Sequence, residues 1–115
     1  MKILRNILIA SYLSIISVTA FSGSLGAAKI TSIRVDANGF GIITFNTSLT
    51  SPAACLNPYY ANALAINTNT SGGKAQLATA LFARGKNNTV YAYGTGSCNA
   101  YAATLEDLSI LQELN

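Results

Sequence analysis

The two cysteines are the residues of this chain with the most definite chemistry. Cys55 and Cys98 are the only cysteines among 115 residues. In an exported chain, an even count of two predicts one disulfide. The alternatives are two free thiols or a bridge between two chains. A bridge within one chain would close a long loop. The chain-entropy model predicts that this closure stabilises the folded protein by about 4 kcal/mol.

Groups that could act as a general acid or base are scarce. The chain has no histidine and four acidic residues. Two of these acids, Glu106 and Asp107, are neighbours, and on a strand their side chains would point to opposite faces. We therefore expect a solvated edge here, not an acid–base pair, and no serine lies in a nucleophile elbow. These observations predict no catalytic residue, no bound metal and no cofactor.

Tyrosines offer a different kind of chemistry. Val90 and Ala92 alternate with Tyr91 and Tyr93, so if the small apolar residues face the core the tyrosines face outward. Rigid aromatic rings near short amides and hydroxyls suit recognition of a sugar or a partner protein. The alternative is that the rings only shield a sheet face. The candidate ligand-binding residues are Tyr91, Tyr93, Ser97 and Asn99.

Residues 1–20 have the pattern of a secretory signal peptide. Lys2 and Arg5 precede an apolar stretch over 7–16, and Val18-Thr19-Ala20 places small residues where signal peptidase needs them. The apolar stretch is shorter than the ~20 residues of a membrane span. We expect cleavage after Ala20, with the small residues of 22–28 offering later sites, and a single domain over 21–115.

The charge balance argues against a nucleic-acid partner. Two of the seven cations lie in the predicted signal, so five cations against four acids leave +1 on the mature chain. An exported protein this weakly charged lacks the cationic groove that nucleic acids require. The short signal is typical of bacteria. We expect a periplasmic or secreted protein with no stable membrane insertion once the signal is removed.

The mature chain begins with a predicted hairpin. Residues 29–36 and 40–46 form its strands around Asn38-Gly39, which tolerate positive φ. A two-residue turn would pair Val35 with Ile42. A three-residue turn with a bulge at Gly39 is favoured, because it pairs Val35 with Gly41 and puts the apolar residues on one face. Those residues are Ile33, Val35, Ile43 and Phe45.

Three further elements and an ambiguous tail follow. Strands are predicted at 63–67 and 88–94, and a helix at 74–84 lies between them. Ser71 is its expected N-cap and Gly85 its expected end. Its apolar stripe is expected to consist of Leu77, Ala78, Leu81 and Phe82. The tail at 104–114 fits a helix or a strand; the strand is favoured because it would close the sheet.

The element order is therefore β-β-β-α-β-β, in a fold that is mainly β with one helix (α+β). This is the order of a small five-stranded OB-like barrel, in which a helix lies between the third and fourth strands. Cys55 precedes the third strand and Cys98 follows the fourth. In such a barrel these strand ends lie together, which makes a bridge between the two cysteines geometrically natural.

The chain also resembles known proteins. The segment from Asn62 through Cys98 is similar to small signal-bearing bacterial proteins of unknown function. In these proteins a strand leads into a helix that starts with Gly-Lys, and a strand, a Gly-Thr-Gly loop and a cysteine follow. Here the corresponding residues are Gly73-Lys74, the helix at 75–83, the strand at 90–93 and the loop Gly94-Thr95-Gly96-Ser97-Cys98. More distantly, size, signal, single disulfide and element order are similar to the pentameric OB-fold B subunits of bacterial A–B toxins. That resemblance implies glycan binding, but it carries no binding residue over to this sequence.

Three functional hypotheses follow. The first is an exported non-catalytic binding module whose partner is a protein or a glycan. The second is a glycan-binding subunit of a toxin-type assembly. The third is an inhibitor of an exported enzyme that acts through the loops around the disulfide. The size of the assembly in solution separates the first two hypotheses.

Overall fold

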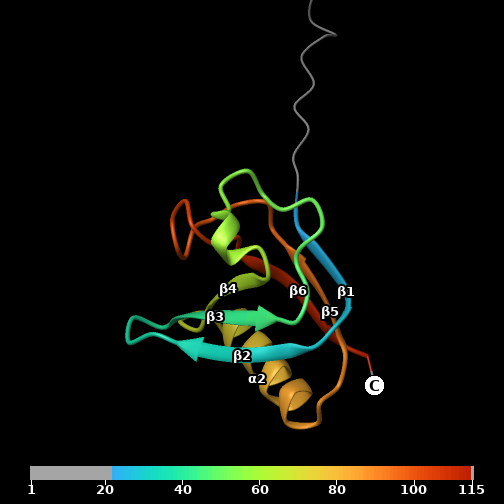
Figure 1. The fold of residues 1–115 in the computed structure, drawn as a ribbon. Coiled ribbons are helices and arrows are strands. Elements are labelled where there is room, and N and C mark those ends of the chain that lie inside the picture. The colour runs from blue at the N-terminus through green and yellow to red at the C-terminus, as the bar shows by residue number, and fades with distance from the viewer. Residues whose placement is uncertain (1–21, 115) are drawn as a thin grey trace, which may run out of the picture.

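Six strands form two three-stranded antiparallel sheets in the part of the chain that the structure describes (Figure 1). This structure is a computed structural model, and it describes residues 22–114. The predicted signal peptide at 1–20 lies outside the described residues. One sheet has the order β1-β5-β6, with β1 at Ser24–Ala28, β5 at Val90–Gly94 and β6 at Leu108–Glu113. The other has the order β2-β3-β4, with β2 at Ile30–Val35, β3 at Phe40–Phe45 and β4 at Ala63–Asn67.

The hairpin of β2 and β3 has the predicted register. Ile33 pairs with Ile43 and Val35 with Gly41. Gly39 has a φ of 89°, a left-handed conformation that glycine adopts without steric cost. The predicted apolar face is correct except at Val35, which is 48% exposed. This residue lies beside the turn, where the strand extends beyond the core.

The sequence-based prediction of five strands was wrong, because β1 was missed. Its sequence, Ser-Leu-Gly-Ala-Ala, has little β propensity. Tertiary contacts stabilise it instead: β1 pairs antiparallel with β5, and Leu25 and Ala28 are buried in the core. Residues 24–28 are therefore part of the folded domain.

The predicted closed barrel was also wrong. The two sheets are joined at Lys29, between β1 and β2, and approach each other again where Ala65 of β4 meets Asp107 in a single parallel bridge. The Ala65 amide donates to the carbonyl of Glu106 at 2.8 Å. This bridge is isolated, and β6 starts at the next residue, Leu108. The preferred assignment of the tail as a strand is confirmed over 108–113.

The helix α2 spans Ser71–Gly85 and contacts β2, β4 and β6, so it packs on both sheets (Figure 1). A 3-10 turn, η1, spans Pro58–Tyr60. The N-cap of α2 is Thr70, not the predicted Ser71, since the Thr70 hydroxyl accepts from the Gly73 amide at 2.9 Å. Within residues 22–114, no helix is long and apolar enough to cross a membrane.

The buried face of α2 differs from the predicted stripe. Gly73, Ala80 and Ala83 are buried, whereas Leu81 and Phe82 are 55% and 54% exposed. The first turn of the helix lies against the end of β4, where a Cβ on Gly73 would lie 1.7 Å from the Asn67 carbonyl oxygen. The fully buried residues of this face are therefore glycine and alanine. Of the rest of the predicted stripe, Leu77 is partly buried against the core and Ala78 is exposed.

This geometry predicts effects of different size on stability for two substitutions on α2. Ala83→Leu should lower the free energy of unfolding by about 1–3 kcal/mol, because it overpacks a filled core. The matched control, Leu81→Ala, should change it by no more than about 0.5 kcal/mol. Urea unfolding of both variants measures the difference. A larger loss for Leu81→Ala would restore the predicted stripe as the buried face.

Candidate functional site

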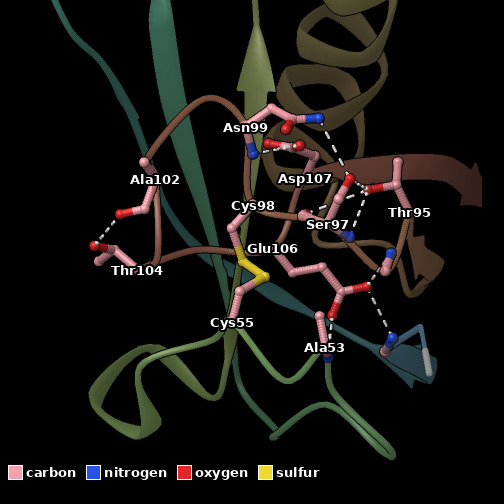
Figure 2. The surroundings of a disulfide bond; sticks show 12 residues. Ala53, Cys55, Thr95, Ser97, Cys98, Asn99, Ala102, Thr104, Glu106 and Asp107 are labelled. Atoms are coloured by element: carbon pink, nitrogen blue, oxygen red, sulfur yellow. Dashed lines mark hydrogen bonds between the residues drawn. A yellow bond between two sulfur atoms is a disulfide. The ribbon is translucent and has the colours of Figure 1, made fainter. Parts of the chain in front are cut away.

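The disulfide between Cys55 and Cys98 forms within one chain, as predicted. The two cysteines are 43 positions apart, and their Cα atoms lie 6.1 Å from each other. The bridge joins the long loop after β3 to the loop after β5 (Figure 2). A disulfide of this kind indicates an oxidising, exported compartment.

Glu106, beside the disulfide, is fully buried at 0% exposure. Its Oε1 accepts from the Ala53 amide at 2.8 Å, and its Oε2 accepts from the amides of Gly23 and Gly96 at 2.9 Å and 3.0 Å (Figure 2). One side chain thus holds the segment before β1 and both loops that carry the cysteines. Within residues 22–114, no Lys or Arg forms an ion pair with it. The expectation that Glu106 lies at a solvated edge was wrong.

Two glycines, Gly94 and Gly23, lie next to the carboxylate of Glu106. A Cβ on Gly94 would lie 1.9 Å from Glu106 Oε2. A Cβ on Gly23 would lie 2.9 Å from Oε1. The glycines at these two positions therefore leave room for the carboxylate.

Asp107 has its own, separate set of partners. Its Oδ1 accepts from the Ala100 amide at 3.0 Å and its Oδ2 from the Asn99 amide at 2.8 Å. These bonds shape the loop that follows Cys98. Glu106 and Asp107 thus share no hydrogen-bond partner, and both bind backbone amides in a structural role.

A cleft of about 400 Å³ opens beside Asp107. It lies between β4, the start of α2 and the segment that leads into β6. Asn99 is one of its lining residues, but Ser97 and the two tyrosines Tyr91 and Tyr93 are not. Ser97 is held within its own loop, where its hydroxyl lies 3.0 Å from that of Thr95. The cleft is lined by Phe40, Ala65, Ile66, Asn67, Thr70, Gly72, Gly73, Gln76, Asn99, Ala100, Asp107 and Leu108.

The orientation predicted for β5 is confirmed. Val90 and Ala92 are buried, whereas Tyr91 and Tyr93 are 39% and 44% exposed. Opposite them on β6, Ile110 pairs with Tyr93 and Gln112 with Tyr91. Ile110 is also exposed. We call this surface the tyrosine face; it consists of Gly26, Tyr91, Tyr93, Ile110 and Gln112.

Glycine at position 26 leaves space for one of these rings. A Cβ on Gly26 of β1 would lie 3.0 Å from the ring of Tyr91. The ring therefore lies close to the backbone of β1. Candidate residues Tyr91 and Tyr93 thus lie on the outside of the β1-β5-β6 sheet. Of the other two candidates, Asn99 lines the cleft and Ser97 lies in the loop after β5.

Tyr101 was not among the predicted site residues, yet its ionisation is strongly perturbed. Burial and the hydrogen bond from its hydroxyl to Asp36 raise the pKa of Tyr101 to about 12. Arg34, whose Nε lies 2.7 Å from Asp36 Oδ1, and the Tyr101 hydroxyl lower the pKa of Asp36. The ring of Tyr101 also packs edge-on against Phe40, with 6.1 Å between ring centroids.

No protein-family model, curated protein or solved structure matches this chain.

Gly94→Ala should destabilise the protein, because its methyl group would overlap Glu106 Oε2. We expect a loss of about 2 kcal/mol or more in the free energy of unfolding, as for other overpacked sites. Gly85→Ala is the matched control, since nothing lies within 4 Å of a Cβ there. Equal unfolding midpoints in urea for the two variants would contradict the account of Glu106.

Tyr101 should ionise later than an ordinary tyrosine. Its pKa is raised in the folded state, so its stabilising contribution is complete below pH 10 and is lost as the pH rises through about 12. A spectrophotometric titration of the phenolates should show a final step there that Tyr101→Phe removes. In the control Tyr59→Phe this step should persist; its disappearance in the control would show that the assignment to Tyr101 is incorrect.

Proposed function

We propose that this protein is an exported, non-catalytic binding module that recognises its partner through the tyrosine face. One observation carries the proposal: two neighbouring tyrosines of one strand expose their rings, and Ile110 of the adjacent strand is exposed beside them. Exposed aromatic and aliphatic side chains that adjoin one another are typical of interaction surfaces.

The properties of the face favour recognition by contact. The sheet beneath it is anchored in the core by Val90 and Ala92, so the tyrosines are presented from a rigid support. Tyrosine loses little conformational entropy on binding and offers both a ring and a hydroxyl. The Gln112 amide, opposite Tyr91, adds a hydrogen-bonding group at the edge of the rings. A ring beside an amide suits a sugar as well as a protein surface.

The chemistry of the acids supports the non-catalytic part of the proposal. Glu106 is buried and bonded to three backbone amides, and Asp107 is bonded to two. Asp36 is engaged with Arg34 and Tyr101. None of these three carboxylates is placed to exchange a proton with a ligand on the tyrosine face.

A glycan-binding subunit of an assembly of identical chains is the second candidate. It is favoured by the ring of Tyr91 beside the Gln112 amide, a combination in which a sugar can both stack and form hydrogen bonds. Sedimentation of the mature protein separates a single module from such an assembly. The disulfide supports a periplasmic or secreted location for both candidates.

The double variant Tyr91→Ala, Tyr93→Ala should abolish binding to glycans on an array or to captured partner proteins. Stability should fall by no more than about 1–2 kcal/mol, because the rings lie outside the core. The control is Tyr59→Ala, which removes an exposed ring on η1, outside the tyrosine face, and should leave binding intact. Retained binding in the double variant would refute the proposed surface. A stability loss of ~3 kcal/mol or more would show that the rings act as core residues.

A further inference from the structure

Gly23 is the first buried residue in the part of the chain that the structure describes. The Gly23 carbonyl accepts from the Gly94 amide at 2.8 Å, and the Gly23 amide donates to Glu106. Directly after it, β1 pairs with β5 and buries Leu25 and Ala28. Removal of residues 23–28 would expose the edge of β5 and open the core. Cleavage at the later alternative sites, from position 23 onward, is therefore incompatible with this fold.

Glu106 is a buried carboxylate with no cationic side chain as its partner in residues 22–114. Hydrogen bonds from three amides satisfy its oxygen atoms but leave its negative charge uncompensated. A buried charge without an opposite charge is costly, and proteins normally pair it. The nitrogen of Gly23 lies 2.9 Å from Glu106 Oε2, at the distance of an ion pair.

The sequence before Gly23 contains a possible signal-peptidase site. Cleavage there would place a positive charge beside Glu106. Ala20 and Ser22 are small residues at positions −3 and −1 of the Ser22–Gly23 bond, which is the spacing that signal peptidase requires. Ser22 itself is exposed, in contrast to Gly23, which is buried. A cut at this bond would convert the Gly23 amide into an α-amino group.

We propose that export processing cleaves the Ser22–Gly23 bond and that the new α-ammonium group of Gly23 forms a buried ion pair with Glu106. In the cleavage step, water adds across the peptide bond: Ser22 keeps the carboxylate, and Gly23 receives the amino group, which is protonated at neutral pH. The inference rests on the proposed export but not on the ligand or on the tyrosine face.

The geometry favours glycine as the first mature residue. A side chain at position 23 would start 2.9 Å from Glu106 Oε1, in the space where the carboxylate lies. Cleavage after Ala20, the first choice from the sequence, would keep Phe21 and Ser22 and leave an uncharged amide at Gly23. The two cleavage sites therefore predict different charges beside the same buried carboxylate.

The first experiment identifies the mature N-terminus. The full-length chain is expressed with export in a bacterial host, and the exported protein is analysed by intact mass and N-terminal sequencing. We expect the first residue to be Gly23. A protein that begins at Phe21, or at any residue after Gly23, would overturn the proposal, and this result does not depend on ligand binding.

The second experiment tests the ion pair. Two mature proteins are prepared, one beginning at Gly23 and one at Phe21, each with Glu106 and with Glu106→Gln. The two-residue extension should lower the melting temperature by about 5 °C in the Glu106 protein, where it removes a charge pair, and by much less in the Gln variant. Equal shifts in both backgrounds would refute the ion pair.

A third protein keeps the test decisive if Glu106→Gln fails to fold. Acetylation of the α-amino group in the protein that begins at Gly23 removes the charge without adding residues. It should lower the melting temperature by a similar amount. An unchanged melting temperature after acetylation would contradict the proposal. Ligand binding through the tyrosine face should be the same in all folded variants, so the failure of either proposal can be recognised separately.

Discussion

The buried carboxylate of Glu106 is the interaction on which the arrangement of this small domain depends. Its two oxygens bind amides from the segment before β1, from the loop after β3 and from the loop after β5. These segments are far apart in the sequence, and no strand pairing connects all three. The nearby disulfide links the two loops covalently (Figure 2). The covalent bond limits the separation of the loops, whereas the carboxylate orients their backbones.

The position of Glu106 also explains why a single bridge joins the two sheets. The carbonyl of Glu106 accepts from Ala65 of β4 while its side chain points to the amides on the other side. Glu106 therefore lies where the two sheets meet, and β6 starts two residues later. A continuous ladder of hydrogen bonds between β4 and β6 would close a barrel. The single bridge instead leaves the two sheets as separate units, with α2 packed on both.

Small residues decide which surfaces are left for recognition. On α2, close approach to the sheets selects Gly73, Ala80 and Ala83 for the buried face. In the β1-β5-β6 sheet, Gly26 leaves room for the ring of Tyr91. On α2 a larger residue would clash with the elements beneath the helix, and at position 26 it would displace the Tyr91 ring. Small residues thus influence where the rings and the aliphatic groups lie on the surface.

The sequence by itself determined the local features whose causes lie within a few residues. Alternation in β5 placed Val90 inside and Tyr91 outside. In the hairpin the Asn-Gly turn left two registers open, and the apolar face selected the correct one, because strand periodicity and turn geometry are short-range properties. The cysteine count in an exported chain predicted the disulfide. Tertiary structure alone decided the burial of Glu106, the strand β1 and the face of α2. Each of these features depends on contacts between segments that are distant in sequence. A local sequence pattern does not show how closely two elements approach, or which groups bind a buried charge.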